Sequence, residues 1–152
     1  MRTLRPERVT ERSLPELLPL LRSYCRFSGV DRSDDELLAV CRALIADPAC
    51  EGVQFLARDG GGRAVGFASL FWTWATWVAG RIGILGDLYV VEDARRHGIG
   101  EALVEACHDE CRARGARGLT WSTAADNAAA RALNERVGAR SREGWIDFWL
   151  DP

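Results

Sequence analysis

The segment Arg95–Gly100 constrains the fold most, because it stands between an expected strand and an expected helix. Before it, Ile82–Val91 is rich in branched and aromatic residues, which is typical of a strand. After it, apolar residues recur every four positions, as on one face of a helix: Ile99, Leu103, Cys107 and Cys111. The chain is therefore expected to turn from a strand directly into a helix at two closely spaced glycines.

This strand-to-helix turn predicts a binding site for phosphate. Gly98 and Gly100 let the backbone approach a ligand closely, and the first N–H groups of the helix lack acceptors within it. These N–H groups and the helix dipole attract phosphate, and the neighbouring arginines add positive charge where a pyrophosphate would lie. The expected pyrophosphate cradle consists of Arg95, Arg96, His97, Gly98, Ile99, Gly100 and Glu101.

Other phosphate-binding motifs do not fit this turn. A dinucleotide fingerprint needs a third glycine three residues after Gly100, and Leu103 stands there. A P-loop needs a lysine, and the sequence contains none. The absence of lysine also excludes pyridoxal-phosphate and other Schiff-base chemistry, which depend on a lysine amine.

The remaining pattern carries a resemblance to a known family. Arg95, Gly98 and Gly100 fill the Arg/Gln-x-x-Gly-x-Gly/Ala signature of the GNAT superfamily of acetyl-CoA-dependent N-acetyltransferases. A second block of that family, in which an Asn opens a helix that ends at a Gly, is matched by Asn127, Ala130, Leu133, Arg136 and Gly138. The resemblance covers nearly the whole chain.

The resemblance implies an α/β fold with a mixed, mostly antiparallel central sheet that is flanked by helices and splayed at the acetyl-CoA site. It assigns cofactor binding to the strand backbone of Leu88, Tyr89 and Val90, whose N–H groups would polarise the thioester carbonyl. It extends the cofactor site to Asn127, Ala130 and Arg136 of the second block. Gly86, in the same strand, is consistent with the bulge that splays the sheet in this family, and a glycine required only by packing is the alternative.

Two further segments resemble the spermidine/spermine (diamine) N-acetyltransferase-like branch: Thr73–Trp77 and Glu143–Phe148. The position that carries a general-acid tyrosine in that branch is Asn134 here, and the branch's carboxylate next to its Asp is Gly86. Asp87 is therefore our candidate for the remaining catalytic carboxylate, and Asn134 is expected to line the reaction centre. An asparagine donates a hydrogen bond to sulfur but cannot deliver a proton.

Length and composition restrict the other possibilities. A chain of 152 residues without linkers or repeats predicts one domain over 1–152. A formal net charge of −2 argues against nucleic-acid binding, and no apolar run is long enough to span a membrane. Five irregularly spaced cysteines favour free thiols and a cytoplasmic location. Cys107, His108 and Cys111 are close in sequence, but no second pair of ligands completes a metal site, so no metal is expected.

Periodicity and turn residues predict the element order β-α-α-β-β-β-α-β-α-β. The expected elements outside the cofactor turn are strands at 3–9, 53–57, 64–74 and 118–123, helices at 13–24, 33–46 and 128–137, and a terminal strand over 145–150. The terminal strand is apolar on both faces and must be covered, for which a second subunit is one candidate. We therefore expect a homodimer.

We interpret the chain as an acetyl-CoA-dependent N-acetyltransferase acting on a primary amine of a small molecule by direct transfer. A polyamine or diamine is the first candidate acceptor, and an amino acid or an antibiotic amine the next. Two alternatives stay open: a noncatalytic, regulatory acetyl-CoA-binding module, and an acyltransferase with a longer acyl donor. The sequence does not distinguish between these acceptors, because nothing in the cofactor turn depends on the acceptor.

Overall fold

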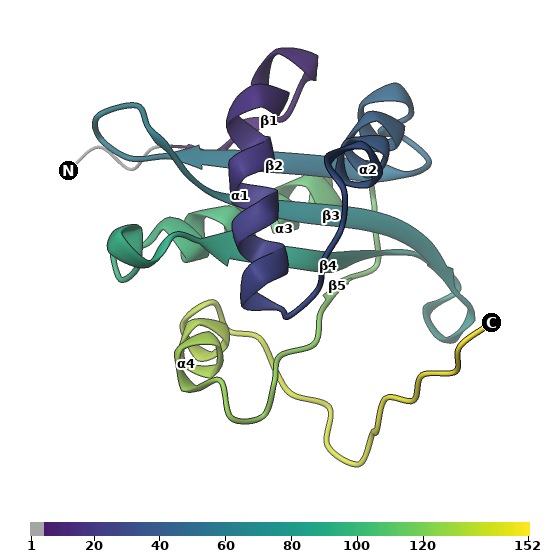
Figure 1. Cartoon of the computed structure of the whole chain (residues 1–152). Helices are drawn as coiled ribbons and strands as arrows, with labels where there is room; N and C mark the ends of the chain where they lie inside the picture. Colours follow the sequence, from purple (N-terminus) through teal and green to yellow (C-terminus); the bar gives the residue numbers. More distant parts are fainter. Residues whose placement is uncertain (1–4) are drawn as a thin grey trace. The chain divides into compact units, whose positions relative to one another are not determined.

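A five-stranded sheet in the order β1-β2-β3-β4-β5 forms the centre of the fold in this computed structural model, which describes residues 5–152 (Figure 1). Its strands are β1 Glu7–Arg8, β2 Gly52–Arg58, β3 Ala64–Ala75, β4 Gly80–Val90 and β5 Leu119–Thr120. The first four strands pair antiparallel, and β5 pairs parallel to β4. The mixed, mostly antiparallel α/β fold predicted from the sequence is confirmed.

Helices lie on both faces of the sheet (Figure 1). On one face, α1 (Leu14–Phe27) and α2 (Asp34–Ala46) pack on β2 and β3, through a core that includes Leu17, Leu21, Cys41, Leu56 and Phe67. On the other face, α3 (Ile99–Ala113) places Leu103 against Gly66 of β3 and Cys111 against Gly83 of β4. We call these the α1 face and the α3 face.

The chain divides into two compact units, Met1–Ser122 and Thr123–Pro152. The first unit holds the sheet and α1 to α3, and the second holds α4 (Ala128–Arg136) followed by an extended segment. Three short 3-10 turns, Glu11–Ser13, Thr76–Val78 and Glu92–Ala94, complete the elements of the described residues. A single domain over 1–152 stays a prediction.

The sequence Ser33–Glu36 has the pattern of a capping box, and the N-terminal end of α2 forms accordingly. Ser33 Oγ accepts a hydrogen bond from the Glu36 amide at 3.2 Å, and the Glu36 carboxylate accepts one from the Ser33 amide at 2.7 Å. This capping box satisfies two N–H groups that would otherwise lack partners at the helix start. The hydrogen bonds at Ser33 also lower the pKa of the Glu36 carboxyl.

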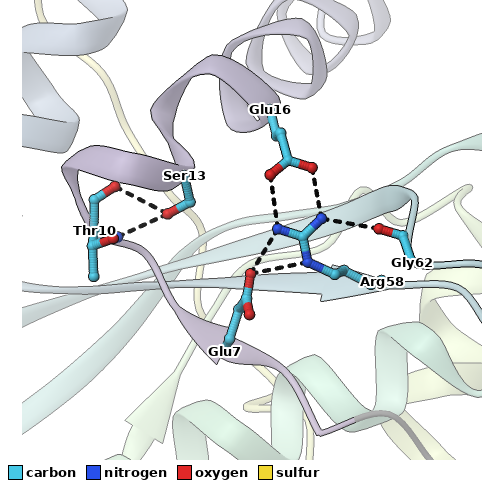
Figure 2. A network of polar contacts seen from close by, with 6 residues as sticks. All are labelled: Glu7, Thr10, Ser13, Glu16, Arg58 and Gly62. Carbon is cyan, nitrogen blue, oxygen red and sulfur yellow. Dashed lines mark hydrogen bonds and ion pairs between the residues drawn. The ribbon is translucent and has the colours of Figure 1, made fainter.

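Arg58 fastens the start of α1 to the sheet (Figure 2). Its guanidinium donates to Glu7 of β1 at 2.9 Å, to Glu16 of α1 at 2.6 Å, and to the Gly62 carbonyl of the β2–β3 turn at 3.0 Å. Nearby, Ser13 Oγ accepts from the Thr10 amide and donates to the Thr10 carbonyl (Figure 2). These contacts hold α1 in the position from which Tyr24 reaches the sheet.

Four expectations about individual segments need correction. The strand expected at 3–9 spans only Glu7–Arg8 among the described residues, and Thr3 and Leu4 lie outside them. The helical spacing of Leu37, Val40, Cys41, Leu44 and Ile45 predicts one apolar face of α2, but Val40 is 47% exposed. The strand expected at 118–123 is reduced to Leu119–Thr120. The terminal segment 145–150 forms no strand, and its large apolar side chains are 73% to 92% exposed.

Candidate active site

The sheet opens beside the outer half of β4. Its parallel pairing with β5 is limited to Gly83↔Leu119 and Ile84↔Thr120, so among the described residues no strand adjoins Leu85–Val90 on that side. The Val91 amide donates to the Val65 carbonyl of β3, so by the alternation of an antiparallel ladder the amides of Leu88 and Val90 face the open edge. The same alternation turns the Tyr89 amide toward β3. The open edge therefore offers two backbone donors.

A bulge at Gly86 shapes this part of β4. Ser69 pairs with Asp87 and Leu70 pairs with Leu85, so Gly86 is the extra residue between them. A Cβ atom at Gly86 would overlap the ring of Phe71 on β3. The sequence left two readings of Gly86 open, a bulge and a glycine required by packing, and the position shows both the bulge and the close contact with Phe71.

Replacing Gly86 by alanine is expected to lower the free energy of unfolding by about 1–3 kcal/mol, because a side chain there overpacks against Phe71. Equilibrium urea unfolding measures the loss. The double variant Gly86→Ala with Phe71→Leu should recover more than half of it, since the shorter side chain makes room. A Gly86→Ala variant as stable as the parent would show that the Phe71 ring rotates away without cost.

The expected phosphate turn lies directly after β4 and its short 3-10 turn. Gly98 is the N-cap of α3 with φ of +78°, and Arg96 also adopts a positive φ of +65°. A Cβ atom at Gly98 would meet no other atom within 4 Å, so the space in front of the helix is open. The first amides of the 15-residue α3 therefore point into this opening with the positive end of the helix dipole behind them.

The two arginines of the turn behave differently. Arg95 Nε donates to the Val90 carbonyl at 2.8 Å, and its guanidinium lies 5.6 Å from the Phe27 ring and 5.9 Å from the Tyr89 ring. The side chain of Arg95 thus joins the end of α1 to the end of β4. Arg96 is exposed. His97 is also exposed, and its Nδ1 lies 3.4 Å from the Ala94 carbonyl.

Asp87 lies on the α1 face of β4 and is half-buried. Its neighbour across the sheet is Ser69, and Tyr24 of α1 approaches it from above. Burial, followed by the negative charge of Asp87 and a hydrogen bond to it, raises the pKa of Tyr24 to about 12. Asp87 is the catalytic carboxylate predicted from the sequence, whereas the sequence alone favours an ordinary surface or packing role for Tyr24. The signal that marks this place is a polar residue between nonpolar neighbours in each of three adjacent strands: Gln54, Ser69 and Asp87.

The second unit carries the other expected cofactor residues. Asn127 is the N-cap of α4, and its side-chain oxygen accepts from the Ala130 amide at 3.1 Å. Asn134 Nδ2 donates to Thr123 Oγ1 at 3.1 Å. Arg136 is the last residue of α4 and is exposed. The local helix and its cap thus form as predicted, and the roles of Asn127, Ala130, Asn134 and Arg136 at a ligand stay predictions.

The cysteines of α3 are core residues. Cys107 and Cys111 are buried, and burial raises the pKa of Cys107 to about 12 and that of Cys111 to about 11. Both thiols are therefore protonated at neutral pH, whereas metal binding requires thiolates. His108 is exposed. Within residues 5–152, no group of three or more His, Cys, Asp or Glu side chains is arranged to hold a metal ion.

The three tryptophans near the β3–β4 hairpin do not line one continuous aromatic surface. Trp72 is half-buried, and its indole donates to the Pro48 carbonyl at 3.0 Å. Trp74 is 77% exposed and lies 5.8 Å from the Arg81 guanidinium, while Trp77 is 68% exposed in the following turn. Trp72 thus packs the sheet against the end of α2, and the other two lie at the hairpin tip.

A glycine turn precedes α3, and the sheet beside it is open along the outer half of β4. This is the arrangement of a coenzyme A-dependent acetyltransferase. The model of the Acetyltransferase (GNAT) family matches residues 14–139, and the chain belongs to this family. The uncharacterized N-acetyltransferase YhfO of Bacillus subtilis (strain 168) is 36% identical over 101 residues, which are 66% of this chain and 67% of YhfO. The chain is therefore an acetyl-CoA-dependent N-acetyltransferase, and acetyl-CoA is its cosubstrate.

Solved structures share the fold. The crystal structure of a probable acetyltransferase superposes with a TM-score of 0.84 and 26% identity, covering 98% of both chains. The aminoglycoside N-acetyltransferase AAC(6')-Iy in complex with CoA superposes with a TM-score of 0.80 and 18% identity, covering 95% of this chain and 93% of that one. At that identity the likeness to AAC(6')-Iy concerns the fold.

Proposed function

We propose that this enzyme transfers the acetyl group of acetyl-CoA directly to a primary amine of a small molecule, with a polyamine or diamine as the first candidate. The observation that carries the proposal is Asp87, a half-buried carboxylate on the α1 face of β4 beside the bulge at Gly86. A carboxylate there attracts the ammonium form of an amine and takes its proton. A similar fold is found in AAC(6')-Iy, solved with a bisubstrate analogue of coenzyme A and an acetylated neamine.

In the proposed complex, the pyrophosphate of acetyl-CoA binds to the backbone amides of Arg96 to Glu101. The Leu88 and Val90 amides, which face the open edge of β4, donate to the thioester carbonyl and stabilise the charge that develops on its oxygen. Asn127, Ala130 and Arg136 complete the cofactor site. Asn134 donates a hydrogen bond to the departing sulfur.

We further propose that the enzyme is a cytoplasmic homodimer. All five cysteines are free, as is usual where thiols are kept reduced. The second unit ends in a segment whose Trp145, Ile146, Phe148, Trp149 and Leu150 are highly exposed, and such a run favours burial against another chain. Analytical ultracentrifugation tests the dimer, and a single monomeric species at micromolar concentration would contradict it.

Thiol release from acetyl-CoA is expected with 1,4-diaminobutane or spermidine, measured beside a panel of amino acids and aminoglycosides. Release with a diamine supports the proposal, and release with another amine class keeps the enzyme but replaces the acceptor. If no amine gives thiol release while calorimetry shows acetyl-CoA binding, the result would favour a regulatory acetyl-CoA-binding module. Asn134 and Gly86 motivate that alternative, because the polyamine branch carries a general acid and a carboxylate at these two positions.

A further inference from the structure

The Val90 carbonyl at the end of β4 takes its hydrogen bond from a side chain. In an antiparallel strand the carbonyl and the amide of one residue point to the same side, so this carbonyl lies at the open edge together with the Val90 amide. Within residues 5–152, no strand adjoins β4 at this place. Arg95 Nε donates to the Val90 carbonyl at 2.8 Å and thus supplies the partner that a strand would have given.

The peptide group between Val90 and Val91 is bonded on both sides of the strand. Its carbonyl accepts from Arg95 Nε, and its N–H group, which belongs to Val91, donates to the Val65 carbonyl of β3 at 2.9 Å. A planar peptide group that is bonded at both ends cannot rotate without breaking one of these bonds. The Val90 amide belongs to the preceding peptide group, so its direction at the open edge depends on this fixed neighbour.

Arg95 is also the residue at which the cofactor turn begins. Its backbone is extended, with φ of −69° and ψ of 160°, and its amide donates to the Glu92 carbonyl at 3.3 Å. The next residue, Arg96, has φ of +65°, and Gly98 has φ of +78°. A positive φ at a residue with a side chain costs free energy and persists only where the surroundings impose it. The bond from Arg95 to Val90 ties the start of this turn to the strand before it.

Two aromatic rings restrict the guanidinium of Arg95. It lies 5.6 Å from the ring centre of Phe27, at the end of α1, and 5.9 Å from that of Tyr89 on β4. Both distances are within the range of a cation–π contact. The two rings themselves lie 6.3 Å apart, with 52° between their planes. The rings thus hold the Arg95 side chain beside the end of β4, where its Nε meets the Val90 carbonyl.

We propose that Arg95 is a positioning residue of the acetyl-CoA site, which acts through the hydrogen bond from its Nε to the Val90 carbonyl. The inference rests on the proposed function, in which the Val90 amide contacts the thioester and the amides from Arg96 to Glu101 bind the pyrophosphate. One side chain then fixes the two ends of the cofactor site relative to each other. What the site requires of Arg95 is the Nε donor, and this separates the inference from a direct contact of its charge with the pyrophosphate.

Two substitutions of similar length separate the donor from the charge. Glutamine carries its amide nitrogen at the same number of bonds from Cα as Nε of arginine, whereas methionine has neither donor nor charge. Arg95→Met should weaken acetyl-CoA binding about 10-fold in isothermal titration calorimetry, since the turn must then be ordered on binding without that hydrogen bond. Arg95→Gln should recover most of this loss and bind within about 3-fold of the parent, the remainder reflecting the lost ring contacts.

Equal losses in the two variants would overturn the proposal, because both lack the charge and only Arg95→Met lacks the donor. Unchanged affinity of a folded Arg95→Met would overturn it as well. Arg112→Met is the matched control, since Arg112 is exposed in the last turn of α3 and pairs with Asp109 at 3.5 Å. It should bind acetyl-CoA as the parent does. Circular dichroism and urea unfolding check the fold of each variant.

Coenzyme A without its acetyl group tests the thioester end of the site. It has no carbonyl for the Val90 amide, so Arg95→Met should weaken its binding by a smaller factor than that of acetyl-CoA. The same factor for both ligands would overturn the part of the proposal that links Arg95 to the Val90 amide.

The ring contact of Phe27 is tested by a double-mutant cycle. Phe27 is 64% exposed, so Phe27→Leu is expected to fold. It should weaken acetyl-CoA binding about 2-fold to 5-fold through the lost contact with Arg95. In the Arg95→Met background the same substitution should have no effect, because the guanidinium is absent. Additive losses in the double variant would overturn the role of the Phe27 ring.

Failure of this inference and failure of the proposed function give different results, and neither measurement needs an amine. If Gly98→Glu weakens acetyl-CoA binding and Arg95→Met does not, the cofactor binds at the turn and only the role of Arg95 is wrong. If neither substitution changes the affinity, the pyrophosphate binds elsewhere, and the proposed cofactor site is wrong together with the inference.

Discussion

Replacing Gly98 by glutamate is expected to weaken acetyl-CoA binding by at least about 100-fold, which corresponds to roughly 2.7 kcal/mol. The new carboxylate would stand at the N-cap of α3, where the first amides of the helix receive the pyrophosphate in our proposal. It would accept from those amides itself and repel the incoming phosphates. A charge-assisted hydrogen bond contributes about 1.5–3 kcal/mol, so loss of one or two accounts for the effect. Isothermal titration calorimetry with acetyl-CoA measures it.

Two control variants isolate the charge. Gly98→Ala introduces the strain of a side chain at a positive φ without a carboxylate, and it should weaken binding only a few-fold. Gly62→Glu places the same carboxylate on another glycine with positive φ and open space, in the β2–β3 turn. It should leave the affinity unchanged. Unchanged affinity of Gly98→Glu would mean that the pyrophosphate binds away from the start of α3.

Replacing Asp87 by asparagine should lower kcat/KM for the amine by on the order of 10² to 10⁴, while the affinity for acetyl-CoA stays as in the parent. The asparagine keeps the shape of the side chain and its place opposite Ser69, but its amide cannot accept a proton at neutral pH. The loss in kcat/KM therefore reports both the attraction of the ammonium and the proton transfer, and the change in kcat separates the second from the first. Steady-state thiol release and calorimetry together measure the two quantities.

Asp93→Asn is the matched control, because it removes the same charge from the exposed Asp93, whose carboxylate pairs with Arg63 at 2.9 Å. Its kcat/KM should be within a factor of two or three of the parent, since surface ion pairs contribute little. If Asp87→Asn kept full activity in a folded enzyme, Asp87 would be a structural residue, and the proton acceptor would have to be sought elsewhere.

Local signals in the sequence predicted the parts that depend on neighbours along the chain. The capping box of Ser33 and Glu36 and the strand-to-helix turn at Gly98 arise within a few residues, and both are present. The bulge at Gly86 depends in addition on the pairing of β4 with β3. Periodicity alone was less reliable at Val40, because a face of α2 that is apolar in sequence extends beyond the surface that the sheet covers.

The terminal segment shows the limit of such signals. An apolar run predicts a strand only if a partner strand is present to take its hydrogen bonds, and the sequence of 145–150 does not contain that information. In the structure this segment has no regular hydrogen-bonding pattern. Likewise, the bond from Arg95 Nε to the Val90 carbonyl does not follow from the place of Arg95 in the motif, and the role of Arg95 at a pyrophosphate stays a prediction.

By itself, the sequence determined the class of the protein, because the glycines of the strand-to-helix turn and the absence of lysine restrict the possible cofactors. The turn can be predicted from the sequence because it depends on the backbone conformation close to each glycine. Only the tertiary structure decided which side chains meet. Gln54, Ser69, Asp87 and Tyr24 come from three strands and a helix, and strand register and the packing of α1 bring them together. A one-residue shift of register would turn such residues to the opposite face, so their assembly cannot be read from spacing along the chain.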